Sequence, residues 1–316
     1  MRVINPVEIT DDNFVSSIVE EDDYDEWVID TTYGVGDKVI VTTGYHKIYE
    51  SLRVDNVGNF PPDFLSGEVP WWMEVSSTNR WKMFDGLIES QTTEGSFIEV
   101  SLLPGKINSI AFLNIVAMYI TVIMTDPVAG EVYNETISFQ ATEDVLWGDG
   151  DLWGDVGNAE ERIWQGGNDE ELVEKVALRT DLPNYPQATL QIIIAGAEGT
   201  AACGKVIIGT TIKLGDTKWS PSVGMIDYST KTQDSFGNYV VQIRSFSKKV
   251  GCIFQMETAI HSEILRKLAQ YRATPLLWIL SETYNVSLIY GFYKDFDMNV
   301  TNNFLTDCNI NIEGLI

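Results

Sequence analysis

The chain has 316 residues, more than one ordinary core accommodates, and its 44% hydrophobic content predicts that most of it folds, in two or three domains. Its formal net charge of −25 argues against phosphate backbones and anionic membrane surfaces as direct partners, because like charges repel. The acidic excess is uneven: residues 1–225 carry 13 basic and 37 acidic side chains, whereas residues 226–316 carry eight and nine.

The first 26 residues are predicted to form an acidic, solvated arm, because residues 20–26 read EEDDYDE. They lack the apolar segment of a secretory signal, which predicts a protein made in a reducing cytoplasm. Three widely spaced cysteines without a CxxC pair indicate buried free thiols, with neither a disulfide framework nor a zinc site: Cys203, Cys252 and Cys308.

Residues 27–79 are predicted to form a small β module. A GVGD turn at 34–37 precedes two strands, 38–43 and 45–52, whose spacing suits a hairpin. A loop rich in Asn, Gly and Pro follows at 55–70, and a short strand at 71–75 closes the unit.

Residues 80–225 are predicted to form a β-sandwich of the jelly-roll type, because short strands alternate with turn signals. The apolar stretch 107–124 is interrupted by polar residues, so we interpret it as two buried strands and not as a membrane span. Residues 147–167 are predicted to form a long loop. The expected strands are 97–102, 109–114, 119–125, 132–139, 189–195 and 205–212.

Residues 226–316 are predicted to form an α+β assembly domain with one amphipathic helix at 258–272. Its apolar face would hold Ile260, Ile264, Leu265, Leu268 and Tyr271, and Pro275 would end it. The expected strands are 238–246, 251–257, 276–280, 287–296 and 309–312. The fold class is therefore mainly β and multidomain.

The sequence contains no motif that indicates catalysis or a cofactor. Its two histidines, His46 in a strand and His261 on the helix, lack a neighbouring nucleophile pattern, and there is no HExxH, P-loop or dinucleotide fingerprint. Acidic residues are too abundant to single out a glycosidase pair. A calcium site at Asp149, Asp151 and Asp155 is a weaker alternative to a solvated acidic loop.

Aromatic residues recur through the small module and have two interpretations. Flat rings stack on the apolar faces of sugars, but a unit this small also needs aromatic rings for its core. The candidate sugar-binding residues are Trp27, Tyr33, Tyr45, Tyr49, Trp71 and Trp72. Trp71 and Trp72 are adjacent on a predicted strand, so they should point to opposite faces, with at most one in the core.

The module resembles small carbohydrate-binding modules of the chitin-binding type. That family shows a leading Trp, a Tyr-x-x-Gly-Asp-x-Val turn, a strand ending in Tyr and a closing Trp. Here these correspond to Trp27, residues 33–39, Tyr45 and Tyr49, and Trp71-Trp72. The sequence departs from the family in its long 55–70 insertion, and the resemblance implies sugar binding at the aromatic residues.

A second resemblance, to bacteriophage tail and baseplate proteins, touches most of the chain. The segments that carry it are 79–85 (NRWKMFD), 272–275 (RATP) with Trp278, 290–296 (YGFYKDF) and 312–315 (IEGL). The central domain, with CGKVIIG at 203–209, is similar to galactose-binding-like jelly rolls.

These resemblances imply a non-enzymatic structural component of a virion tail, without a cofactor, that assembles with itself and with neighbouring tail proteins. No direct nucleic-acid contact and no membrane insertion are expected. Two alternatives remain: a carbohydrate-binding adhesin or receptor-binding protein that contacts a host-surface glycan, and a cell-wall hydrolase. The charge-balanced residues 226–316 are the expected docking region, because surfaces with few charges are easier to desolvate.

Overall fold

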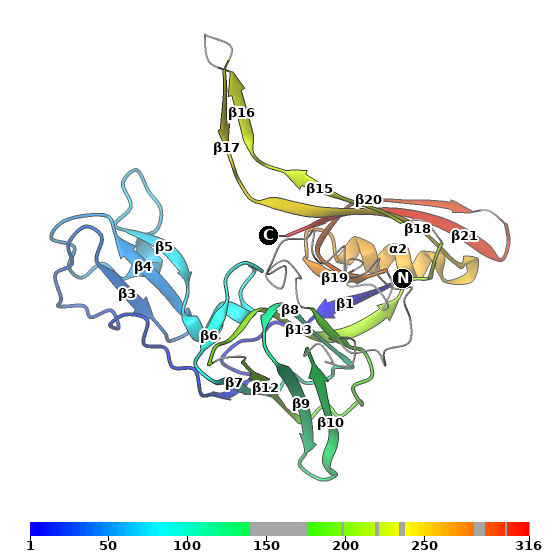
Figure 1. Ribbon diagram of the computed structural model, residues 1–316, viewed down its shortest axis with the longest axis horizontal. Helices are drawn as coiled ribbons and strands as arrows, with labels where there is room; N and C mark the ends of the chain where they lie inside the picture. The colour runs from blue at the N-terminus through cyan, green and yellow to red at the C-terminus, as the bar shows by residue number, and fades with distance from the viewer. Residues whose placement is uncertain are drawn as a thin grey trace, which may run out of the picture.

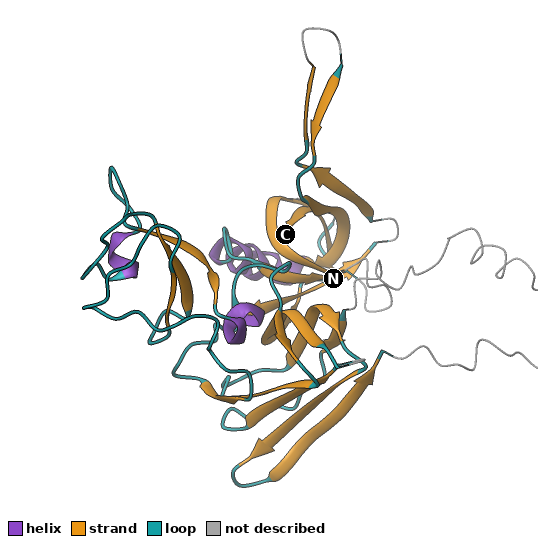
Figure 2. Ribbon diagram, turned by 60° about the vertical axis from the view of Figure 1, so that its left-hand side comes forward, coloured by secondary structure: helices purple, strands orange, loops and turns teal. Residues whose placement is uncertain are grey.

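The computed structural model describes residues 1–139, 176–196, 199–218, 221–233, 238–280, 288–300 and 302–315. The protein is mainly β, with several sheets and a helix near the C-terminal end, as the sequence predicts (Figures 1 and 2). The described residues form a large antiparallel sheet, a second sheet packed on part of it, a separate small sheet and a projecting hairpin.

The large sheet and the second sheet packed on it form what we call the body of the protein. The strands of the large sheet have the order β11-β8-β13-β1-β19-β20-β21-β18-β14. Outside this order, β6 also pairs with β13 and β15 also pairs with β18. Its strands are β1 (Arg2–Pro6), β6 (Thr92–Glu94), β8 (Ser109–Val116), β11 (Ala177–Arg179), β13 (Ala201–Lys213), β14 (Asp216–Thr217), β15 (Ser222–Asp227), β18 (Phe246–Glu257), β19 (Leu276–Ile279), β20 (Leu288–Val300) and β21 (Leu305–Gly314).

The second sheet has the order β10-β9-β12-β7-β2 and covers one face of β8 and β13. Its strands are β2 (Phe14–Ser17), β7 (Phe97–Leu102), β9 (Tyr119–Asp126), β10 (Gly130–Ser138) and β12 (Thr189–Ala195). Alternate residues of β9 and β12 are fully buried, among them Ile120, Val122 and Ile192. The predicted sandwich is therefore present, and the apolar stretch 107–124 is two of its buried strands.

The C-terminal part of the large sheet has its own core. The 3-10 turn η5 (Thr258–Ile260) leads into α2 (His261–Gln270), which packs Ile264 and Leu268 against this sheet. The predicted helix is present, but of its predicted apolar face only Ile264 and Leu268 are buried, and Leu265, about 100° around the helix from Ile264, is 50% exposed. In the part of the chain that the structure describes, no helix is long and apolar enough to cross a membrane.

The small module has a three-stranded sheet of β3 (Lys38–Val41), β4 (Lys47–Ser51) and β5 (Trp72–Ser77), and a 3-10 turn η1 (Pro61–Phe64). Among the described residues its strands pair with one another and, through a single bridge from Ile40, with Glu26; the module lies to one side of the body (Figure 1). A second 3-10 helix, η2 (Asn79–Phe84), connects the module to the sandwich.

Two predicted boundaries are wrong. Residues 1–26 are not a separate solvated arm, because β1 pairs with both β13 and β19 in the middle of the large sheet, and β2 pairs with β7. Val3 and Ile4 are fully buried. Two apolar residues are too short a pattern to predict a buried strand beside the long acidic segment that follows them. The boundary between 225 and 226 also falls inside β15, so one sheet spans the two predicted domains.

The three cysteines are free and buried, which confirms the interpretation from their spacing.

Candidate functional site

Three of the six candidate sugar-binding aromatic residues belong to the core of the module. Tyr33, Tyr49 and Trp72 are 8%, 2% and 0% exposed, and they pack with Val39 and Val41. The edge of Tyr33 meets Trp72, with ring centroids 5.3 Å apart. These rings cannot contact a sugar without unfolding of the module.

The two adjacent tryptophans differ in burial, but not because they alternate on a strand: β5 begins at Trp72, and Trp71 precedes it and packs at the edge of the same core. The indole N–H of Trp72 donates to the carbonyl of Asn59 at 2.8 Å, inside the core. Trp71 is partly buried, and the guanidinium of Arg53 lies 4.5 Å from the centroid of its ring. Trp71 therefore presents a face that Arg53 already contacts.

The remaining aromatic residues form a cluster at the surface of the module, which we call the aromatic cluster: Trp27, Tyr45 and Phe60. The ring of Phe60 lies 5.1 Å from that of Trp27 and 5.9 Å from that of Tyr45, both in edge-to-face geometry. Tyr45 is 45% exposed. Phe60 lies in a Pro-rich loop, and the sequence of this loop does not indicate that Phe60 contacts the other two rings.

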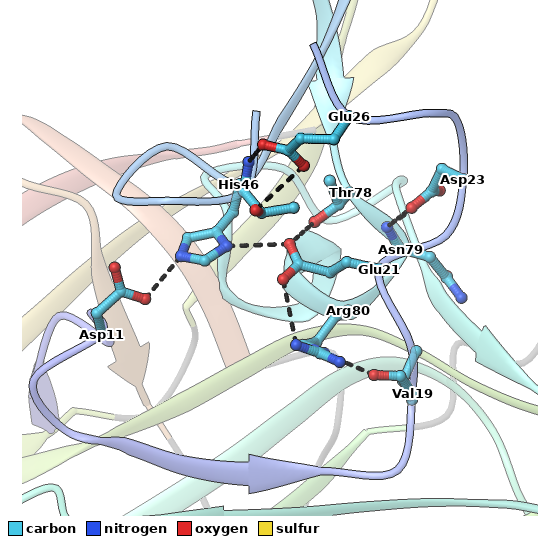
Figure 3. A network of polar contacts seen from close by, with 10 residues as sticks. Asp11, Val19, Glu21, Asp23, Glu26, His46, Thr78, Asn79 and Arg80 are labelled. Atoms are coloured by element: carbon cyan, nitrogen blue, oxygen red, sulfur yellow. Dashed lines mark hydrogen bonds and ion pairs between the residues drawn. The ribbon is translucent and has the colours of Figure 1, made fainter. Parts of the chain in front are cut away.

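A polar network joins the module to the body at the turn of the β3–β4 hairpin (Figure 3). His46 lies in the turn and not in a strand as predicted, with a positive φ of 53°. Its Nε2 lies 2.7 Å from a carboxylate oxygen of Asp11, and its Nδ1 lies 3.0 Å from one of Glu21. Its ring stacks on Trp81 of η2 at 4.0 Å between centroids.

Glu21 is the buried centre of this network, with its side chain 8% exposed. It accepts hydrogen bonds from the Thr78 hydroxyl at 2.6 Å and from the Arg80 guanidinium at 3.2 Å. Arg80 also donates to the carbonyl of Val19 at 2.6 Å. The acidic run 20–26, predicted to be solvated, thus contributes a buried and fully paired carboxylate.

The pKa values of both groups shift in the directions that favour an ion pair. Burial raises a carboxyl pKa, but hydrogen bonds from His46 and Thr78 outweigh it, so the pKa of Glu21 is lowered. Burial lowers an imidazole pKa, but hydrogen bonds with Glu21 and Asp11 outweigh it, so the pKa of His46 is raised above 6.5.

A cavity of about 480 Å³ opens beside this network, between the loop after β1 and the turn of the hairpin. The residues that line it are Glu8, Ile9, Thr10, Asp11, Asp12, Gly44, Tyr45, His46, Lys47, Ser77, Trp81, Phe84 and Asp85. His46 contacts two carboxylates and an indole here, and these contacts fix the position of its ring.

The projecting hairpin is the second prominent surface. We call residues 222–250 the arm; it comprises β15, β16 (Thr230–Gln233), β17 (Tyr239–Gln242) and the start of β18, and it extends away from the rest in both views (Figures 1 and 2). Among the residues that the structure describes, β16 and β17 pair only with each other. Large apolar residues are exposed along it: Val223, Met225, Tyr228, Tyr239, Val241, Ile243 and Phe246.

The calcium candidates Asp149, Asp151 and Asp155 lie outside the described residues, as does most of the loop predicted at 147–167. Within the described ranges, no group of three or more His, Cys, Asp or Glu side chains is placed to hold a metal ion.

Comparison with protein-family models, curated proteins and solved structures gives no match for this chain.

Proposed function

We propose that this protein is a structural component of a bacteriophage tail or baseplate, made in the host cytoplasm and assembled into the virion through contacts with further copies of itself and with neighbouring tail proteins. The tail assignment rests on the sequence resemblance. The assembly part rests on one observation, the exposed apolar arm.

The arm is expected to need a partner. An isolated two-stranded hairpin is marginally stable in water, and β16 and β17 form such a pair beyond the edge of the large sheet. Tyr239 is 70% exposed and Ile243 is 85% exposed, and apolar side chains gathered on a projection mark contact surfaces.

The distribution of charge favours a second copy of this chain as the partner that the arm binds. The arm carries four basic and two acidic side chains, whereas the whole chain carries 21 and 46. The arm is thus net positive and the rest strongly negative, so the arm of one copy is attracted to the body of another. The apolar residues then supply the contact that remains when salt screens the charges.

Sedimentation velocity of the full chain over a range of concentrations tests this assembly. We expect wild type to form oligomers and Ile243→Asp to shift them towards monomer. Val128, in a turn of the second sheet, is 93% exposed, so Val128→Asp is the matched control and should assemble like wild type. A wild-type chain that stays monomeric at high concentration would refute self-assembly.

The virion assignment has its own test. Antibody labelling of purified particles, viewed by negative-stain electron microscopy, should place the protein on the tail. Its absence from particles would exclude a tail role even if the chain oligomerises.

A second candidate function, binding of a host-surface glycan, is favoured by the aromatic cluster. Tyr45 presents a half-exposed ring beside Phe60 and Trp27, and such a face can stack on a sugar. A glycan array with the full chain should lose its signal in Tyr45→Ala and keep it in Tyr119→Ala, which removes a similarly exposed ring from β9. Absence of any wild-type signal would remove this candidate.

A further inference from the structure

We propose that the polar network at the turn of the β3–β4 hairpin is a proton-controlled latch, which holds the module 27–77 in place on the body and loosens when His46 loses its proton. The latch consists of Asp11, Glu21, His46, Thr78 and Arg80. This inference goes beyond the assembly proposed above and does not depend on it.

Besides this network, the described hydrogen bonds between the module and the rest of the chain lie at its two ends. The Glu26 carboxylate accepts from Thr42, and the Thr78 N–H donates to the His46 carbonyl. Its core of Tyr33, Val39, Val41, Tyr49 and Trp72 is separate from the cores of the body, and its sheet is not continuous with the others in the described chain. Two stretches of chain, 18–26 and 78–85, connect it to the sandwich. The module therefore resembles a small domain on two short linkers, for which relative motion is the default.

The latch crosses this joint through one side chain. Asp11 lies in the loop between β1 and β2, and Glu21 lies in the segment after β2, whereas His46 comes from the module's own hairpin (Figure 3). Gly44 and His46 both have positive φ, which turns the chain sharply before β4. His46 is thereby placed between the two carboxylates and over Trp81.

Only the protonated ring satisfies this geometry. Both ring nitrogens of His46 face carboxylate oxygens, at 2.7 and 3.0 Å, and only an imidazolium can donate from both. A neutral imidazole keeps one N–H, so its other nitrogen would direct a lone pair at a carboxylate. Deprotonation therefore replaces one attractive contact with a repulsive one.

Other charged side chains surround His46. Arg80, on η2, is paired with the second oxygen of Glu21. The other charged side chains that line the cavity beside His46 are Glu8, Asp12, Lys47 and Asp85. They lie at the loop after β1, on β4 and at the end of η2, whereas Asp11 and Glu21 are the two carboxylates in direct contact with the imidazole ring.

The direction of the switch follows from the sign of the shift. The pKa of His46 is raised in the folded protein, so the stabilisation from the latch is fully present below pH 6.5 and is lost as the pH rises through the folded-state value. The module is held while His46 is protonated and is freed as the pH rises above its raised, folded-state pKa.

Distance measurements between two spin labels on the full chain test the latch. Val54→Cys places a label on the module and Val128→Cys one on the body, at sites 68% and 93% exposed, while the three native cysteines are buried. We expect a narrow distance distribution at about pH 6 that broadens by about pH 9, on either side of the ordinary histidine range. A width that does not change with pH would overturn the proposal.

Two variants test whether the change in the distance distribution with pH comes from His46. His46→Asn keeps a residue type that tolerates positive φ but cannot carry the charge, so it should give the broad distribution at every pH. His261→Asn, which changes the chain's only other histidine, should behave like wild type. A transition that persists in His46→Asn, or disappears in His261→Asn, would overturn the latch.

A third variant keeps the test informative if His46→Asn does not fold. Asp11 is 55% exposed in its side chain, so Asp11→Asn should fold and remove only one of the two carboxylates. The midpoint of the His46 ring signals in an NMR titration should move to lower pH than in wild type. An unmoved midpoint would show that Asp11 does not stabilise the imidazolium and would contradict the latch.

Discussion

Replacing Trp72 with alanine should unfold the module while leaving the body intact. Trp72 is fully buried, and large-to-small changes of this kind cost about 3–5 kcal/mol. Loss of its indole N–H leaves the Asn59 carbonyl without that donor, at a further cost of about 1 kcal/mol. A unit of roughly 50 residues has only about 3–8 kcal/mol of stability, at 0.05–0.15 kcal/mol per residue.

Hydrogen exchange resolved by segment is the assay. Amides of β3 and β4 should lose their protection in Trp72→Ala, and amides of β9 and β12 should keep theirs, because the two regions have separate cores. Trp71→Ala is the comparison variant, since Trp71 packs only at the edge of the same core and contacts Arg53. It should cost less than Trp72→Ala and leave β3 and β4 protected.

Equal loss of protection in the two variants would refute the assignment of Trp72 to the core and Trp71 to its edge. Loss of protection in β9 and β12 would refute the independence of the two cores.

Three further predictions concern the body. A Cβ at Gly209 would lie 2.0 Å from the Asn5 carbonyl oxygen, so Gly209→Ala should lower the midpoint of thermal unfolding by several degrees, whereas Gly86→Ala, with open space around it, should not. Burial lowers the pKa of Lys205 to about 8, so above that pH the unfolded chain binds more protons than the folded one. In denaturant titrations, the unfolding free energy of wild type relative to Lys205→Met should therefore rise by up to about 3 kcal/mol from pH 8 to 10.5. No rise would contradict the burial of this charge. Burial also raises the pKa of the Cys203 thiol to about 12, so thiol reagents should modify Cys203 only as fast as the surrounding core unfolds and exposes it. Rapid labelling of the native protein would contradict this.

Local patterns predicted most of the strands, because alternation and turn residues act over short distances. The bounds expected for 97–102 and 189–195 coincide with β7 and β12. The segment 238–246 was less well predicted: β17 ends at Gln242, and β18 begins at Phe246, because the chain bends where the arm leaves the sheet.

The long-range features could not be predicted in this way. Nothing in residues 2–6 indicates that β1 will pair with β13 on one side and β19 on the other, since strand partners are chosen by the whole fold. The latch was missed for the same reason. Glu21 was one acidic residue in a run of seven acidic or aromatic positions, and only the fold brings it to His46.

The position of β1 has a kinetic consequence. Its partners in β13 and β19 lie more than 200 residues further along the chain, so the centre of the large sheet is made of contacts between distant segments. Closing such loops costs entropy before any pairing stabilises them, and proteins dominated by distant contacts fold slowly. Until β1 is inserted, the facing edges of β13 and β19 are unpaired, and unpaired edges are where chains aggregate. Refolding from denaturant should therefore be slow and concentration-sensitive, with the completion of this sheet as its last step.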